Sequence, residues 1–118
     1  MPRPHHYGEG FTRALDRLRR YCSVRSSVRV VVSDKAANLN NQETCGTYEA
    51  TKLRRGYDFV IRIARELDYQ VAIDTLLHEW AHCLDIEQNG HSAVRDHRDS
   101  WGICYARAYR AVHDTATI

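Results

Sequence analysis

Apolar residues recur along the chain with two different periods, and these periods predict its helices and strands. Helical spacing marks three segments, at about residues 11–22, 68–88 and 97–113. Alternating or β-branched patterns mark three shorter segments between the first two helices, at about residues 28–33, 44–51 and 57–64. The expected order is therefore α-β-β-β-α-α, an α+β fold in which a three-stranded sheet packs on the middle helix.

Each predicted helix has one apolar face, which we expect to form the core. On the first helix this face comprises Phe11, Leu15, Leu18 and Cys22. On the middle helix it comprises Ile73, Leu76, Leu77, Trp80 and Leu84. On the last helix it comprises Trp101, Cys104, Tyr105, Ala108 and Val112.

The residues between these segments are typical of helix ends and turns. We expect the carboxylate of Asp68 to cap the middle helix, and Asn89-Gly90 to end it. Asp96 is expected to cap the last helix. A polar loop is expected over residues 38–42, and a turn over residues 54–56.

Length and composition suit a single small domain over residues 1–118, with 43% hydrophobic and 27% charged residues. The formal net charge is only +2, but residues 1–29 contain seven arginines against Glu9 and Asp16. A solvated helix face is the simplest explanation of this excess. A phosphate-binding patch, and hence a nucleic-acid partner, is a secondary hypothesis.

No stretch approaches the roughly 20 apolar residues of a membrane span, and Met1–Gly10 lacks the apolar core of a signal peptide. We therefore expect a soluble protein without a membrane partner, in the cytoplasm of a bacterium or a phage-infected host cell. The four cysteines are irregularly spaced without a CxxC pair, which favours buried free thiols; an oxidising compartment would permit two disulfides. They are Cys22, Cys45, Cys83 and Cys104.

The middle helix contains the motif His78-Glu79-Trp80-Ala81-His82, which has the HExxH pattern. Residues four apart lie one turn apart on the same helical face, so both imidazoles can bind one Zn²⁺ ion. Zinc lowers the pKa of a bound water, and Glu79 can then act as the general base. Trp80 is expected to face the core. The motif predicts a zinc-dependent hydrolase.

A catalytic zinc usually has three protein ligands, so the fold must supply a third. No Glu follows Glu87, and Asp85 and Gln88 break the metzincin spacing. The remaining candidates are His91, His97, Asp96, Asp99 and His113. We favour His97, because it falls in the first turn of the last helix on one stripe with Trp101 and Tyr105. His91 is the second choice.

Two sequence segments, LLHEWAHCLD at residues 76–85 and DHRDSWGICYARAYR at residues 96–110, resemble the SprT-like minimal zincins. In that family an HExxH helix is followed by an HxxxF or HxxxW segment. The likeness is greatest to small phage and bacterial members, although Arg98-Asp99-Ser100 replaces their Gly-Pro-Glu. The resemblance covers about residues 57–113 and implies a compact zincin-like fold. It also implies zinc ligands at His78, His82 and His97, with Glu79 as general base.

Other residues near the motif have candidate supporting roles. Asp74 or Asp85 could accept the second N–H of a ligand imidazole, although a solvated acid is the simpler explanation for each. Tyr105 or Tyr109 could stabilise an oxyanion, although both are also ordinary core or rim aromatics.

The sequence therefore predicts a zinc metallopeptidase that acts on a peptide or protein substrate, which would pair with an edge of the sheet. The alternative is a non-enzymatic binding module of phage or bacterial origin, stabilised by zinc. That alternative requires a fourth protein ligand, for which Asp85, His91 and Asp99 are candidates.

Overall fold

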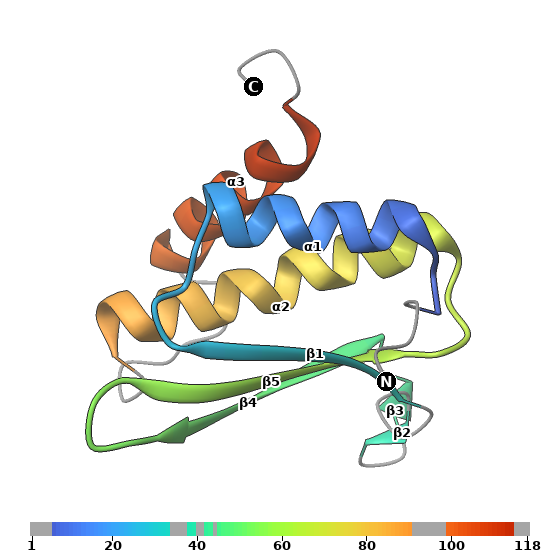
Figure 1. Cartoon of the computed structure of the whole chain (residues 1–118). Helices are drawn as coiled ribbons and strands as arrows, with labels where there is room; N and C mark the ends of the chain where they lie inside the picture. Colours follow the sequence, from blue (N-terminus) through green and yellow to red (C-terminus); the bar gives the residue numbers. More distant parts are fainter. Residues whose placement is uncertain (1–5, 34–37, 40–41, 44, 91–98, 115–118) are drawn as a thin grey trace.

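Three helices lie on one face of a mixed β-sheet in the computed structural model of this protein (Figure 1). The structure describes residues 6–33, 38–39, 42–43, 45–90 and 99–114. Its elements are α1 (Glu9–Tyr21), β1 (Ser27–Ser33), β2 (Asn38–Leu39), β3 (Gln42–Glu43), β4 (Gly46–Lys52), β5 (Tyr57–Ala64), α2 (Tyr69–Asn89) and α3 (Asp99–His113). The predicted α+β class and element order are confirmed, with β2 and β3 as a short additional pair.

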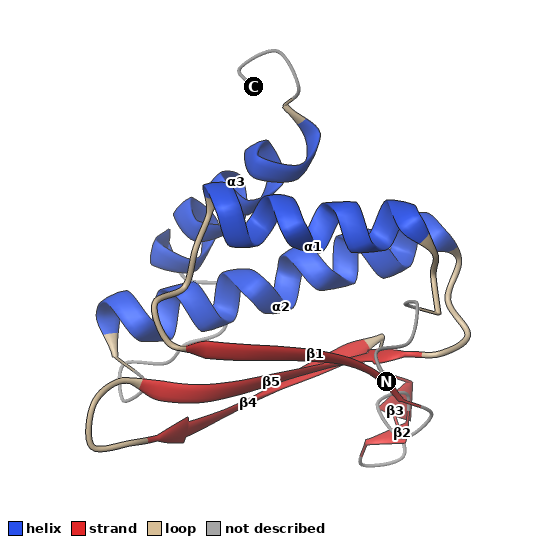
Figure 2. Cartoon of the chain, in the orientation of Figure 1, coloured by secondary structure: helices blue, strands red, loops and turns tan. Residues whose placement is uncertain are grey.

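The main sheet has the strand order β1-β5-β4 (Figure 2). β5 pairs in parallel with β1 and antiparallel with β4, so that Ile61 lies between Val30 and Tyr48. As the central strand, β5 is the most deeply buried, and the side chains of Phe59, Ile61 and Ile63 are fully covered. Because the order is β1-β5-β4, β4 is an edge strand. Its outer side pairs with no other strand of this sheet among the described residues.

The two faces of the sheet differ because side chains alternate along each strand. All three helices lie on one side of the sheet, and α2 is the helix that packs against its strands, on β4 and β5 (Figure 1). The other face carries exposed charged pairs instead. Arg62 Nη1 lies 2.7 Å from Glu49 Oε2, and Arg29 Nη2 lies 4.0 Å from Asp58 Oδ2.

The predicted apolar faces of the helices form the core. The four predicted residues of α1 and the five of α2 are all buried. On α3, Cys104 and Ala108 are buried, while Trp101, Tyr105 and Val112 pack against the core with partial exposure. Gly90 ends α2 with a positive φ of 87°, as its position in the sequence predicts.

Three details differ from the expectations. Asp68 is at the N-cap position of α2, but its side chain makes no capping bond; its backbone carbonyl instead accepts the Ala72 N–H at 2.8 Å. The expected polar loop over residues 38–42 includes strand residues that pair as β2 and β3. All four cysteines are free, but Cys45 is exposed, because it precedes the edge strand β4 and lies outside the core. The predicted cap at Asp96 lies outside the described residues.

None of the described helices has the length and apolar run that crossing a membrane requires.

Glu87 joins the C-terminal part of α2 to the start of β1. Its two carboxylate oxygens accept successive backbone N–H groups, from Arg25 at 2.7 Å and from Ser26 at 2.6 Å. Ser26 in turn accepts the N–H of Tyr57 at 3.0 Å through its hydroxyl. Hydrogen bonds to a charged acceptor are stronger than neutral ones, so this carboxylate holds the turn between α1 and the sheet against α2.

We predict that Glu87→Ala lowers the free energy of unfolding by about 1–3 kcal/mol, because two backbone donors lose a charged acceptor. Glu87→Gln should fall between this variant and the wild type, since an amide offers one acceptor oxygen. Urea denaturation measures the effect. Glu49→Ala is the control: it removes an exposed ion pair, which typically contributes about 0.2–1 kcal/mol. Equal losses in the two alanine variants would contradict the role assigned to Glu87.

Candidate metal centre

The HExxH residues lie near the middle of the 21-residue helix α2. The ring centroids of His78 and His82 are 5.0 Å apart, so the two imidazoles are neighbours on one helical face. Glu79 and His82 are each only 7% exposed, while His78 is half-buried. The motif therefore places two imidazoles and a carboxylate in a largely desolvated position.

Trp80 explains how α2 holds this orientation. Its side chain is 1% exposed, and its indole N–H donates to the backbone carbonyl of Cys22 at 2.8 Å. The predicted core position of Trp80 is confirmed. Because the indole ties the core side of α2 to the end of α1, rotation of α2 about its axis would break a buried hydrogen bond.

Aromatic rings from two other elements border the histidine pair. Trp101 of α3 lies 5.0 Å from the ring of His78 and 5.5 Å from that of His82, and its indole N–H is 3.4 Å from the His78 carbonyl oxygen. Tyr48 of β4 stacks on His82 at 4.9 Å. The start of α3 and the edge strand thus meet at the two imidazoles, which reduces their freedom to rotate.

Gly46, the first residue of β4, permits the close approach of this strand to α2. A Cβ atom at this position would lie 2.5 Å from Thr75 Cγ2 and 2.9 Å from the Arg62 carbonyl oxygen. The same Cβ would be 3.6 Å from Glu79 Cγ. The role of Gly46 was not predictable from the sequence, because only the packing of β4 on α2 shows why a side chain cannot be accommodated there.

Each of the two candidate supporting acids accepts a hydrogen bond from another side chain. Asp74 accepts the phenolic O–H of Tyr105 at 2.6 Å, a bond that joins α2 to α3. Asp85 is 9% exposed and accepts the side-chain N–H of Asn89 at 2.8 Å. Tyr105 also stacks on Trp101 at 5.2 Å, whereas Tyr109 is 49% exposed and packs against His113 at 4.5 Å. Tyr105 is therefore the tyrosine linked to the motif.

The structure describes only some of the candidates for the third ligand. His97, His91 and Asp96 lie outside the described residues. Asp99 is the first residue of α3 and is exposed. His113 is at the opposite end of α3, twelve residues after Trp101 and so about 18 Å further along the helix. His113 is thereby separated from the pair.

Among the described residues, no three His, Cys, Asp or Glu side chains form a group that could hold a metal ion. The two that come together are His78 and His82. Imidazoles bound to one tetrahedral zinc through Zn–N bonds of about 2.0–2.1 Å would have ring centres about 5 Å apart. The observed separation of 5.0 Å fits this arrangement, so the histidine pair suits zinc as two of its ligands.

The buried cysteines are poor candidates for further ligands, because thiolates rather than thiols bind zinc. Burial raises the pKa of the Cys83 thiol well above its ordinary value, and the charges of Glu79 and Glu87 raise it further. Burial, followed by the charge of Asp85, raises the pKa of Cys104 to about 11. Burial also raises the pKa of Cys22. The histidines, not these thiols, are the suitable ligands.

Comparison with protein-family models, with curated proteins and with solved structures finds no match to this chain.

We predict that Tyr105 ionises at a higher pH in the folded protein than in the unfolded chain. Its pKa is raised to about 12 by burial and then by its hydrogen bond to Asp74 and the charge of that carboxylate. Because the folded-state pKa is raised, this bond contributes stability below the ordinary tyrosine pKa of about 10, and the contribution is lost as the pH rises from about 10 to 12. An ultraviolet titration of the wild type minus that of Tyr105→Phe should isolate this late ionisation.

Tyr109→Phe serves as the matched control for that titration, since Tyr109 is on the same helix but exposed. Tyr105→Phe should also reduce unfolding free energy by about 0.5–1.5 kcal/mol at neutral pH. If the two difference titrations coincide, the link between Tyr105 and Asp74 does not persist in solution.

Proposed function

We propose that this protein is a zinc metallopeptidase. One observation carries the proposal: His78 and His82 lie side by side on α2, with the largely buried Glu79 between them in sequence. Trp101 adds support, because it contacts both imidazoles and comes four residues after His97 in the sequence. The tryptophan of the HxxxW segment thus packs against the HExxH motif. For this reason we retain His97, in the same segment, as the expected third ligand.

In this proposal, His78, His82 and His97 would hold zinc, which would supply a Lewis acid for the scissile carbonyl and lower the pKa of water. The carboxylate of Glu79 accepts a proton from the attacking water and then delivers it to the nitrogen of the leaving amine. The low exposure of Glu79 favours this role, because electrostatic interactions are stronger where bulk water is excluded. Trp101 and Tyr48 hold the ligand rings and limit access of water from two sides.

The motif resemblance leads us to place the chain with the SprT-like minimal zincins. The α+β fold, in which the HExxH helix lies against the sheet, is what that resemblance implies. The segment between His97 and Trp101 differs from the family pattern, and it lies partly outside the described residues. The proposed assignment rests on the motif and its position on α2.

We propose that the substrate is an extended peptide that binds along β4. This strand is an edge of the main sheet, and Tyr48 within it stacks on His82. Gly46 brings the start of the same strand close to Glu79. A peptide paired with the outer side of β4 would therefore run beside the motif, with backbone hydrogen bonds providing affinity without strict sequence preference.

We place this activity in the cytoplasm of a bacterium or a phage-infected cell. A nucleic-acid partner remains a secondary hypothesis, since several of the seven N-terminal arginines contact protein groups. Arg17 and Arg19 donate to the backbone carbonyls of Ala111 and Val28, at 3.0 and 3.1 Å, and Arg29 is near Asp58.

Glu79→Gln should reduce peptide hydrolysis by at least about 100-fold while zinc remains bound, because the amide cannot act as the base. Hydrolysis of a fluorescently labelled unstructured protein measures activity, and atomic emission measures zinc. Glu66→Gln, a change at an exposed residue outside the motif, is the matched control and should keep full activity. A zinc-bound wild type that cleaves nothing and has a fourth protein ligand, for example Asp85, would instead support the zinc-stabilised binding module.

His97→Ala should release zinc, because the remaining pair supplies only two of the three expected ligands, whereas His91→Ala should retain it. Zinc content after dialysis against a weak chelator, together with X-ray absorption at the zinc edge, distinguishes the two variants. Loss of zinc from His91→Ala and its retention in His97→Ala would identify His91 as the third ligand. Retention of zinc in both variants would exclude both His91 and His97 as that ligand.

A further inference from the structure

A pocket separate from the histidine pair lies where α1, the first turns of α2 and the last turn of α3 meet. Its volume is about 260 Å³. The residues that line it are Gly10, Arg13, Ala14, Arg17, Tyr69, Gln70, Ile73, Val112 and His113. Two arginines and a histidine therefore border the pocket, and none of the described residues that line it is acidic.

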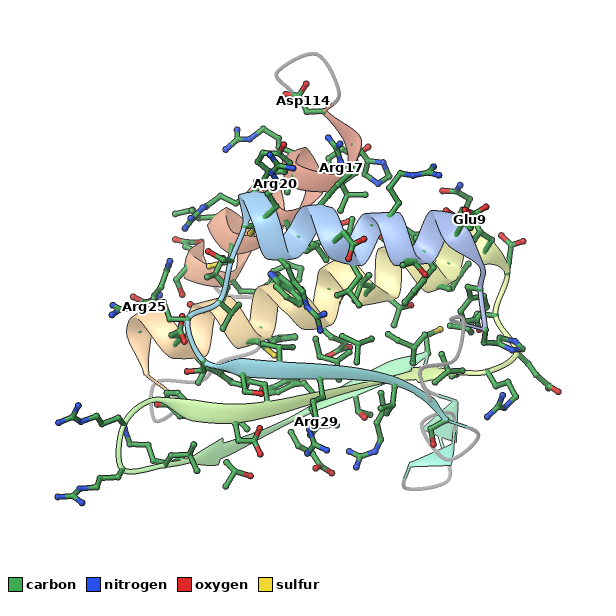
Figure 3. The ribbon with its side chains drawn as sticks, viewed as in Figure 1. Glu9, Arg17, Arg20, Arg25, Arg29 and Asp114 are labelled. Atoms are coloured by element: carbon green, nitrogen blue, oxygen red, sulfur yellow. The ribbon has the colours of Figure 1, made fainter. Side chains whose placement is uncertain are left out.

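Arg17 is the residue whose environment is incomplete. Its Nε donates to the carbonyl of Ala111 at 3.0 Å, and its guanidinium lies 5.7 Å from the ring centre of Tyr21. Its Nη2 atom is buried and has no hydrogen-bond partner among the residues that the structure describes. Figure 3 shows Arg17 extending from α1 toward the end of α3. A buried polar group without a partner in a native fold indicates an ion or water that completes its environment.

The two arginines that border this pocket take no part in the ion pairs of the described residues. Across the part of the chain that the structure describes, neither Arg13 nor Arg17 forms an ion pair with a carboxylate. Arg13 also borders a second hollow, together with Glu9 and Asp16, which are the nearest acids along α1. Buried or partly buried cations are normally paired, so an anion in the pocket would supply the missing partner of Arg17.

The start of α2 adds to the attraction for an anion. Tyr69 and Gln70, its first residues, line the pocket, and its first turn has no acidic residue. The side chain of Asp68 makes no capping bond. It therefore accepts no hydrogen bond from the first N–H groups of α2, which carry the positive end of the helix dipole. The Tyr69 hydroxyl packs beside α1 at Gly10. It occupies the space that a Cβ atom at position 10 would need.

We propose that this pocket binds the phosphate group of a small molecule. Two guanidinium groups, a phenol, an imidazole and a helix N-terminus together favour a multiply charged oxyanion with several acceptor oxygens. The volume of about 260 Å³ is just below the roughly 300–1,000 Å³ of pockets for drug-sized ligands. A phosphate with a small organic group matches this size, whereas a nucleic-acid backbone needs an extended groove.

The ligand would connect all three helices, because the pocket takes residues from each of them. α2 and α3 also carry His78 and Trp101, so a bound phosphate would stabilise the helices on which the proposed metal centre depends. Binding itself does not require that centre to be catalytic.

Calorimetric titration of the full chain with inorganic phosphate, with chloride at equal ionic strength as reference, tests the proposal. We expect saturable binding of one phosphate and an increase in melting temperature. Arg13→Gln should weaken the affinity by at least about tenfold, since it removes a charge-assisted bond. Tyr69→Phe should weaken it less, because it removes one neutral donor. Arg20→Gln is the matched control: it removes the same charge from the same helix outside the pocket lining.

Several results would overturn the proposal. Absence of binding to the folded wild type would do so, as would equal weakening in Arg13→Gln and Arg20→Gln, which would show attraction to overall charge. A short single-stranded oligonucleotide separates the two sources of phosphate; if it binds and inorganic phosphate does not, the surface recognises a nucleic acid rather than a small ligand. All these variants keep His78 and His82. Phosphate attracted by a metal at those histidines would therefore bind Arg13→Gln and Arg20→Gln equally.

Discussion

The burial of α2 is the constraint on which the rest of this structure depends. This helix lies against β4 and β5 on one side and against α1 and α3 on others, and most of its residues from Ala72 to Ile86 are buried. A helix enclosed in this way normally presents apolar residues all round. Here His82, Glu79 and Asp85 are polar and each at most 9% exposed. The surrounding elements must therefore satisfy these groups or provide a ligand for them, because uncompensated burial of polar groups is costly.

Side chains of α3 and β4 pack against this part of α2. Trp101 and Tyr48 place aromatic rings against the imidazoles, and Tyr105 joins α3 to α2 through Asp74. These contacts restrict the histidine rings, which would reduce the entropy lost if the proposed zinc binds there. Zinc would then complete an arrangement that packing has already prepared. The proposed peptidase activity and the proposed phosphate pocket both depend on the same helix, near its middle and at its start.

Much of the fold was predictable, because each element carries a local signal. The helical spacing in α1, α2 and α3 and the alternation in β5 identify the elements and their buried faces, since the pattern of burial repeats with the backbone geometry. Strand pairing was not predictable in the same way. The parallel alignment of β1 with β5 and the edge position of β4 depend on how the chain crosses over, which no local pattern encodes.

The candidate site, like the fold, was only partly predictable from the sequence. The sequence alone determined the HExxH spacing, because i and i+4 share a face on any α-helix, and it determined that Trp80 lies in the core. Only the tertiary structure decided that Gly46 admits β4 next to Glu79 and that Asp74 accepts the Tyr105 hydroxyl. It also decided that the Nη2 atom of Arg17 is buried with no hydrogen-bond partner among the described residues. The physical reason is range: helix periodicity acts over a few residues, whereas these contacts join residues that only the packing of separate elements brings together.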